Sequence, residues 1–211
     1  MAELLSVNRG KPEPIPAKSA LTGIFKRPLA GPVEIDAQGL RDDAILDRRH
    51  HGGVDQAVYI YFADDYRFWS HELNQALEPG TFGENLTIDG VEGASVAVGD
   101  RFTIGPVVLE VTSHRTPCSV FAARMGDPKW VKRFHRAGRP GAYCRVLSPG
   151  AVSAGMSVAV TPYAGERFTV ATLMSFDGQR EIAPDILRRA LTAPVHYKMR
   201  ADYENRLARL F

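Results

Sequence analysis

The residue best suited to chemistry in this sequence is Cys118, which closes the segment 113–118 (SHRTPC). It follows a predicted strand over residues 107–112 and stands three residues after Arg115. A cationic neighbour at a strand end favours the thiolate form, which is both a nucleophile and a soft metal ligand. The alternative is an inert small hydrophobe, the usual role of a free cysteine. Pro117 and the nearby cations disfavour a core position, and both interpretations stay open at this point.

The second cysteine, Cys144, lies in a predicted strand over residues 142–147 (AYCRVL). Side chains alternate between the two faces of a strand, so Cys144 shares a face with Ala142 and Val146. This pattern predicts a core position for Cys144 and directs Arg145 to the opposite, ligand-facing side. Two cysteines do not make a disulfide framework, so we expect two thiols in a reducing compartment.

Two glycine-containing segments could approach a ligand closely. Residues 48–53 (RRHHGG) join paired glycines to cations that include Arg49 and His51, a combination that suits an anion. On composition alone, a surface turn with charged flanks is the favoured interpretation of this segment. Residues 80–86 (GTFGENL) could place the Asn85 amide in a cleft or form a β-bulge with an Asx turn.

Charge is unevenly distributed along the chain. Residues 113–145 contain eight Lys and Arg against the single acid Asp127, which gives +7, while the whole chain carries +2 and the remainder therefore −5. We infer an anionic ligand near Cys118 and no stable nucleic-acid complex, because a protein that is acidic elsewhere binds polyanions poorly. No apolar run approaches the roughly 18 residues of a membrane span, and residues 1–10 do not resemble a signal peptide. We expect a cytoplasmic protein that does not bind membranes.

Short apolar segments separated by turns predict a mainly β fold. We expect an antiparallel β-barrel domain over residues 1–162 with inserted helices, followed by a three-helix C-terminal appendage over residues 165–211. One inserted helix is predicted from the apolar spacing of Tyr66, Trp69 and Leu73, with Asp64 as its cap. The predicted strands cover residues 4–7, 57–62, 84–88, 101–104, 107–112, 142–147 and 156–161. The predicted C-terminal helices cover residues 170–176, 184–191 and 197–210.

Several short segments, taken in order, resemble the MOSC family, named for the C-terminal domain of molybdenum cofactor sulfurase. They are residues 26–28 (KRP), 39–43 (GLRDD), 51–57 (HGGVDQA), 82–86 (FGENL), 99–100 (GD) and 115–118 (RTPC). Each segment alone is unspecific, whereas the ordered set is specific and spans roughly residues 20–160. The C-terminal helices are similar to the extra domain of a bacterial subgroup that reduces N-hydroxylaminopurine-type bases.

The resemblance implies a β-barrel that holds molybdopterin, with Cys118 as the protein ligand to molybdenum. It also implies that Lys26, His51, Asn85 and Arg115 surround the cofactor. Arg49 and Arg145 join them as cationic candidates for binding its anionic groups. The implied activity is the reduction of small N-hydroxylated molecules, a detoxification, with electrons from a separate flavin or iron–sulfur reductase.

Rival functions remain open from the sequence. Cys118 could carry a persulfide in a non-redox sulfur-carrier module, or Lys26 could form a Schiff base with pyridoxal phosphate. The basic segment 113–145 could bind nucleic acid. Cys118 with His50 and His51 could form a zinc site, although the spacing of these three residues is not that of a zinc motif. The sequence leaves the oligomeric state open, including a homodimer.

Overall fold

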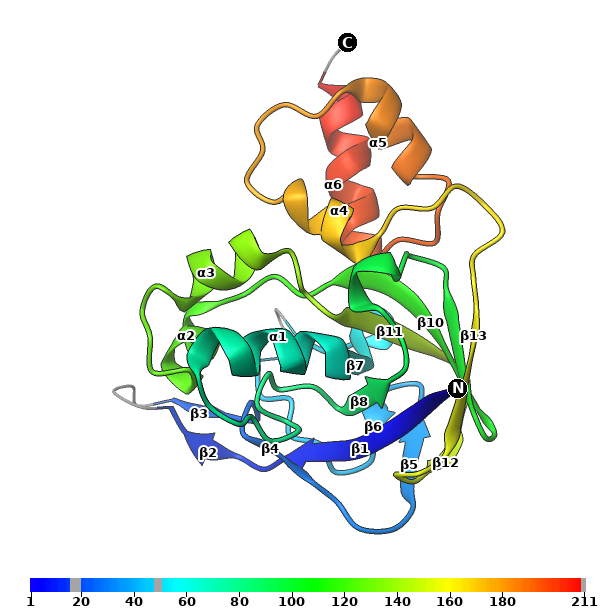
Figure 1. Ribbon diagram of the computed structural model, residues 1–211. Helices are drawn as coiled ribbons and strands as arrows, with labels where there is room; N and C mark the ends of the chain where they lie inside the picture. Colours follow the sequence, from blue (N-terminus) through cyan, green and yellow to red (C-terminus); the bar gives the residue numbers. More distant parts are fainter. Residues whose placement is uncertain (16–19, 48–50, 210–211) are drawn as a thin grey trace.

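The core of the structure is a closed, seven-stranded β-barrel (Figure 1). The computed structural model describes residues 1–15, 20–47 and 51–209 of the chain. Going round the barrel, the strands are β1 (Ala2–Gly10), β13 (Ser157–Thr161), β9 (Arg101–Ile104), β10 (Val107–His114), β11 (Ala142–Ser148), β7 (Val58–Phe62) and β8 (Leu86–Asp89), which returns to β1. The predicted mainly β barrel is confirmed. All pairs in the ring are antiparallel except β7 with β8, which run parallel because a helical crossover joins them.

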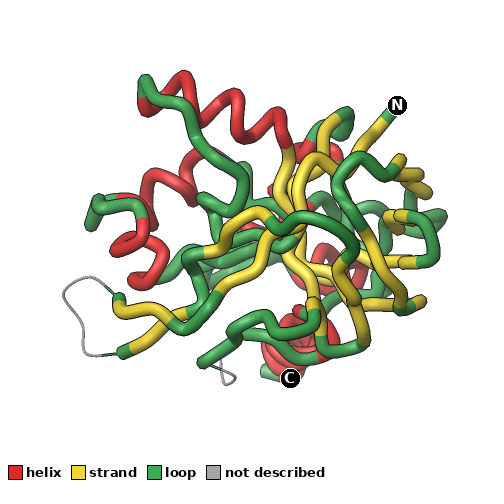
Figure 2. Tube along the Cα trace, turned by 90° about the horizontal axis from the view of Figure 1, so that it is seen from below, coloured by secondary structure: helices red, strands yellow, loops and turns green. Residues whose placement is uncertain are grey.

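Six shorter strands extend or flank the barrel in the described residues. Strand β4 (Lys26–Pro28) pairs with the end of β1. A small sheet contains β12 (Gly150–Val152), β5 (Val33–Asp36) and β6 (Gly39–Leu40). The hairpin of β2 (Glu13–Pro14) and β3 (Leu21–Thr22) projects from the side of the barrel (Figure 2). These strands were not predicted from the sequence, and all but β5 are ladders of two or three residues, which leave too few positions for a periodic signal.

Strand β7 separates two hydrophobic clusters. All five of its side chains are buried. Val58, Ile60 and Phe62 point into the barrel core, whereas Tyr59 and Tyr61 belong to an aromatic cluster with residues of the inserted helices. This division follows from side-chain alternation along a strand that is covered on both faces.

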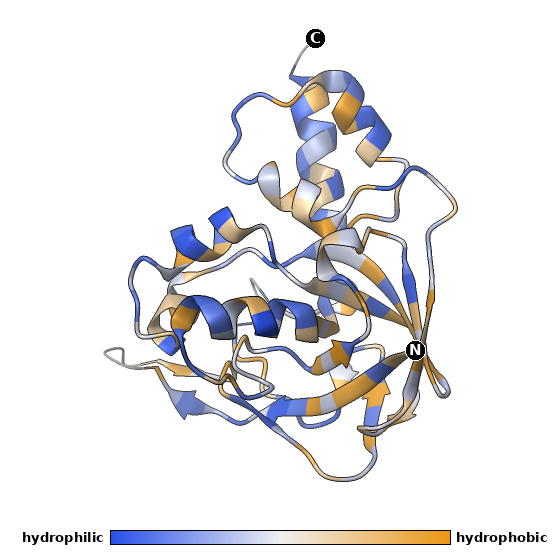
Figure 3. Ribbon diagram, viewed as in Figure 1, coloured by the Kyte–Doolittle hydropathy of each residue, from blue (hydrophilic) through white to orange (hydrophobic). Residues whose placement is uncertain are grey.

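The inserted helices cover the outer face of β7. They are α1 (Ala63–Leu73), α2 (Ser119–Arg124) and α3 (Trp130–Ala137). The described part of the domain also contains two short 3-10 turns, η1 (Val54–Gln56) and η2 (Gly93–Ser95). Helices α1 and α3 carry both hydrophilic and hydrophobic residues (Figure 3). The predicted cap of α1 was wrong: Phe62 occupies the N-cap and Asp64 lies in the first turn.

Three helices follow the barrel, as predicted: α4 (Val170–Ser175), α5 (Pro184–Ala190) and α6 (Tyr197–Ala208). Most of their buried side chains, among them Leu173, Leu187 and Tyr203, belong to the same hydrophobic cluster as the barrel interior, whereas Met174 belongs to the aromatic cluster. The division into domains at residues 162–165 stays a prediction, because the core is continuous across it. Within the described ranges, no helix is both long and apolar enough to cross a lipid bilayer.

Candidate functional site

A cavity of about 250 Å³ opens at one end of the barrel. It is lined by five of the seven residues that the sequence analysis proposed as a site: Lys26, His51, Asn85, Arg115 and Cys118. These residues come from strand β4, the loop before η1, the position just before β8 and the loop after β10. Their convergence from distant segments supports grouping them as one site.

Cys118 occupies the N-cap position of helix α2, four residues beyond the end of β10. Burial raises the pKa of its thiol, but a hydrogen bond from the His51 side chain opposes this effect. Backbone N–H groups of Phe121 and Val120 at the start of α2 and the Arg115 charge act in the same direction as His51, and the pKa falls to about 7. Roughly half of the Cys118 population is therefore thiolate at neutral pH.

We expect the alkylation rate of Cys118 by iodoacetamide in cofactor-free protein to rise with pH with a midpoint near its pKa of about 7. The thiolate is the reacting form, so the rate follows its population. Cys144 is fully buried, and burial raises its pKa well above the ordinary value, so it should stay unmodified in the folded protein. Mass spectrometry of the modified peptides measures both. A midpoint at the ordinary cysteine value of about 8.5 would show that the His51 contact does not form in solution.

Arg115 is a buried cation without an acidic partner. Its side chain is 5% exposed, its guanidinium donates to the Phe82 carbonyl, and it lies 4.1 Å from the Phe121 ring centroid. Among the described residues, no carboxylate forms an ion pair with it. A buried charge is costly unless it is neutralised, so this cation makes the cavity suited to an anionic ligand.

Lys26 is held by an acid that the sequence analysis did not single out. Its ammonium forms a buried ion pair with Asp43, and Asn85 donates to the same carboxylate oxygen at 2.9 Å. The other oxygen of Asp43 accepts from the Gly10 backbone at 2.9 Å. Burial lowers the pKa of Lys26, and the Asp43 carboxylate only partly opposes this effect. The charge of the Lys26 ammonium is thus neutralised by Asp43 in the cavity wall.

Gln56 and Tyr143 are among the other polar residues that line the cavity, and neither was predicted as a site residue. The Gln56 side chain has a buried Oε1 atom that meets no hydrogen-bond partner in the described residues. Tyr143 lies on the strand face opposite Cys144, the side that alternation marks as ligand-facing. Burial raises the pKa of Tyr143, so its hydroxyl stays protonated. In the sequence, Gln56 was indicated only by its place in residues 51–57, one of the segments that resemble the MOSC family.

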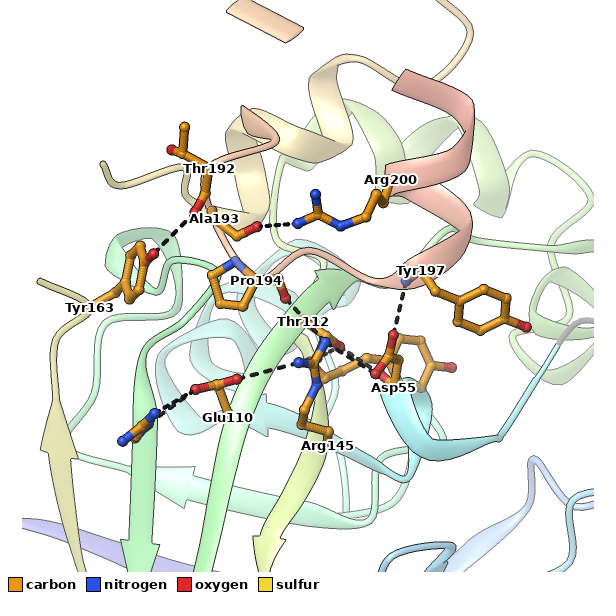
Figure 4. Close-up of polar contacts among 12 residues, drawn as sticks. Asp55, Glu110, Thr112, Arg145, Tyr163, Thr192, Ala193, Pro194, Tyr197 and Arg200 are labelled. Atoms are coloured by element: carbon orange, nitrogen blue, oxygen red, sulfur yellow. Dashed lines mark hydrogen bonds and ion pairs between the residues drawn. The ribbon is translucent and has the colours of Figure 1, made fainter. Parts of the chain in front are cut away.

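Arg145, which was predicted to bind the cofactor, does not line the cavity. It forms ion pairs with Asp55 at 3.1 Å and Glu110 at 3.6 Å and donates to the Pro194 carbonyl at 3.2 Å (Figure 4). Side-chain alternation along β11 correctly predicted that Arg145 and Cys144 lie on opposite faces of the strand. At Arg145, however, this face is covered by the C-terminal segment around Pro194. Arg49 lies outside the described residues.

The thiol of Cys118 is not part of a protein-only metal site in the part of the chain that the structure describes. No three His, Cys, Asp or Glu side chains there are grouped closely enough to hold a metal ion. His51 contacts the thiol, while His50 lies outside the described residues. The residues that the structure describes therefore do not form the ligand cluster that such a zinc site needs.

The fold and the cavity define a class: a closed β-barrel protein with a cavity lined by one cysteine and two buried cations. The chain belongs to the MOSC domain family, whose model matches residues 47–159. The matched region contains His51, Asn85, Arg115 and Cys118, four of the cavity residues. The resemblance noted from the sequence is confirmed.

Similar proteins extend this assignment. The uncharacterized protein YflK of Bacillus subtilis (strain 168) is 37% identical over 157 residues, covering 74% of this chain and 71% of YflK. A protein of Gibberella moniliformis named as a reductase is 30% identical over 91% of this chain, but the chain spans only 35% of its length. The crystal structure of YiiM from Geobacillus stearothermophilus superposes with a TM-score of 0.81 at 25% identity, covering 98% of this chain and 100% of YiiM.

Proposed function

We propose that this chain binds the molybdenum cofactor in the cavity, with Cys118 as the protein ligand to the metal, and reduces small N-hydroxylated compounds. The observation that carries the proposal is the Cys118 thiol, whose pKa is lowered to about 7 beside the buried and unneutralised Arg115. Membership of the MOSC family and similarity to a protein named as a reductase support it.

The residues present fit such a cofactor. Its phosphate and dithiolene groups are anionic, and Arg115 is a buried cation without a carboxylate partner in the described residues. The buried Oε1 of Gln56 has no hydrogen-bond partner among the described residues, so it could accept a hydrogen bond from the pterin ring of the cofactor. A single soft thiolate is sufficient when the cofactor itself brings sulfur ligands, so the cavity does not need a cluster of protein ligands.

When bound, the cofactor would supply removal of the oxygen atom from an N–OH group, in which two electrons and two protons convert R–NHOH to R–NH₂ and water. Cys118 would hold the metal through Sγ, and His51 would donate to that sulfur and moderate its charge. Arg115 would offset the negative charge of the ligand. The hydroxyl of Tyr143 keeps its proton in the cavity, since burial raises its pKa. A separate flavin or iron–sulfur reductase would deliver the electrons.

Turnover of N-hydroxylaminopurine tests the proposed activity. Protein from a molybdenum-replete host, supplied with dithionite-reduced methyl viologen, should form the corresponding aminopurine. The small reductant replaces the unidentified electron donor. Absence of turnover together with cyanide-labile sulfur on Cys118 would instead identify a persulfide carrier.

Replacing Arg115 by alanine should weaken cofactor retention roughly ten- to a hundred-fold. A hydrogen bond to a charged group contributes about 1.5–3 kcal/mol, and this range corresponds to that loss of affinity. The matched control is Lys132→Ala, which removes an exposed cation on α3. Cofactor content after extensive desalting measures the effect. Equal content in the two variants would remove Arg115 from the cofactor site.

A further inference from the structure

Four cations form a basic stripe along helix α3 and its N-cap. Their spacing places them on one side of the helix, whereas Trp130 and Phe134 on the other side are buried. The members of the basic stripe are Lys129, Lys132, Arg133 and Arg136. Within the described residues, only Arg133 of the four forms an ion pair, with Glu72 at 3.6 Å. The stripe therefore presents positive charge that the neighbouring side chains leave largely unneutralised.

A surface groove lies between the basic stripe and helix α1. All four stripe cations line it, together with Phe68 and Trp69 of α1 (Figure 1). Two acids, Glu72 and Asp127, also line the groove, so four cations against two acids leave a charge of +2. Aromatic and arginine side chains are enriched at protein interfaces. The composition of the groove is therefore that of a contact surface for a protein of opposite charge.

The basic stripe also borders the cysteine loop, residues 115–118. A second surface hollow is lined by residues of both. These residues are Lys132, Arg136, Thr116 and Pro117. Asp177 lines the same hollow, and its carboxylate accepts a hydrogen bond from Thr116 at 3.1 Å. A partner seated on the stripe would therefore lie against the outer surface of the loop that ends at Cys118.

Two aromatic rings separate the basic stripe from the cavity. The Arg133 guanidinium lies 5.8 Å from the centroid of the Trp130 ring, and this centroid is 5.8 Å from that of Phe121. The Phe121 ring centroid lies 4.1 Å from the guanidinium of Arg115, which lines the cavity. Phe121 belongs to helix α2, whose N-cap is Cys118. The stripe is thus the charged outer surface of the wall that encloses the candidate site.

We propose that the basic stripe is the docking surface for the acidic face of the protein that delivers electrons to the cavity. The inference rests on the proposed function, in which a separate protein supplies two electrons for each N–OH group. A stripe of cations beside the cysteine loop selects an acidic partner and orients it toward the cavity wall, because complementary charges steer association and suppress wrong partners.

The extent of the stripe favours a protein over a nucleic acid. Its four cations occupy two turns of helix, a length of roughly 10 Å. The chain outside residues 113–145 carries a charge of −5. A polyanion that extended beyond the stripe would meet this negative charge, whereas an acidic patch on a protein ends where the stripe ends.

Binding of the full-length chain to an acidic plant-type 2Fe–2S ferredoxin tests the surface. Lys132→Glu with Arg136→Glu reverses two exposed charges of the stripe. The matched control, Arg188→Glu with Arg209→Glu, makes the same change in net charge on α5 and at the end of α6. At low ionic strength the association rate should fall roughly ten- to a hundred-fold in the stripe variant and stay close to that of the unmodified chain in the control. Surface plasmon resonance measures the rates, and thermal melts verify that both variants are folded.

Carbodiimide cross-linking locates the contact independently of the variants. The reagent joins a lysine ammonium to a carboxylate only where the two touch. Mass spectrometry of the complex between the unmodified chain and ferredoxin should therefore find links at Lys129 and Lys132. The exposed Lys11 and Lys198 lie outside the stripe and are internal controls. Neither this measurement nor the association rate requires turnover of an N-hydroxylated compound.

Slower association of the stripe variant alone, with links at Lys129 and Lys132, supports the docking surface. No binding of ferredoxin, equal rates in the two variants, or links confined to other lysines overturns it. Tighter binding of a single-stranded oligonucleotide than of ferredoxin, or a dimer of the chain that the stripe variant loses, assigns the stripe to another occupant and also overturns it. Failure of the proposed function shows separately, as absence of turnover with reduced methyl viologen in a chain that binds ferredoxin.

Discussion

Cys118→Ser is expected to abolish the reduction of N-hydroxylated compounds while leaving the fold intact. Serine replaces a soft, half-ionised sulfur by a hard hydroxyl that does not ionise at neutral pH. The loss should exceed the roughly 10–100-fold that removal of a supporting outer-shell residue costs a metal site. The fold should survive because Cys118 is the N-cap of α2 and serine is a favoured N-cap residue. Steady-state turnover and a thermal melt measure the two effects.

Cys144→Ser is the matched control for the same chemical change. Cys144 is fully buried in the barrel core, so its hydroxyl variant should lower the free energy of unfolding by about 1–3 kcal/mol. The specific activity of the folded fraction should stay nearly unchanged, since the side chain does not line the cavity. If Cys144→Ser alone abolished activity, or Cys118→Ser retained it, the ligand would be misassigned.

The second large effect is expected from Asp43→Asn, which keeps the shape of the side chain but removes the charge that neutralises Lys26. Breaking a buried ion pair by removing one partner destabilises by about 3–5 kcal/mol, which lowers the Tm of a chain of this size by roughly 6–20 °C. The neighbouring Asp42→Asn is the control, because the Asp42 side chain is 75% exposed. Asparagine also tolerates the positive φ of 61° at that position.

The loss in Asp43→Asn should depend on pH. Burial lowers the pKa of Lys26 in the folded protein, and without Asp43 it falls further. The unfolded chain then binds more protons than the folded chain, so stability rises with pH. The destabilisation should be largest below the folded pKa of Lys26 and should diminish as the pH approaches its unfolded value of about 10.4. Denaturant melts over this range check the sign, and a deficit that grows with pH would contradict the buried ion pair.

Most barrel strands and helices were predictable because their apolar residues recur at strand or helix spacing and turns separate them. Strand β9 has the predicted bounds, and the three C-terminal helices begin at the predicted residues. The many short strands predicted a closed barrel. They did not predict that β7 and β8 pair in parallel. Pairing direction depends on how the crossover packs, which local sequence does not encode.

The candidate site was predictable where residue type and position in a segment indicated chemistry, as for Cys118 and Arg115. It was not predictable where a side chain's role depends on a distant partner. Alternation indicated the face of Arg145 but not that the C-terminal segment covers it. No local pattern pairs Lys26 with Asp43. No local pattern indicates that Asp177 contacts the cysteine loop.

The metal content of the purified protein tests the central claim most directly. The unmodified sequence and Cys118→Ser are produced in the same molybdenum-replete host, desalted, and measured by inductively coupled plasma mass spectrometry. The proposed site predicts molybdenum in stoichiometric proportion to the unmodified chain and its loss from the serine variant, with Cys144→Ser retaining it in the folded fraction. Equal molybdenum in the unmodified and Cys118→Ser proteins, or none in either, would contradict a molybdenum site ligated by Cys118.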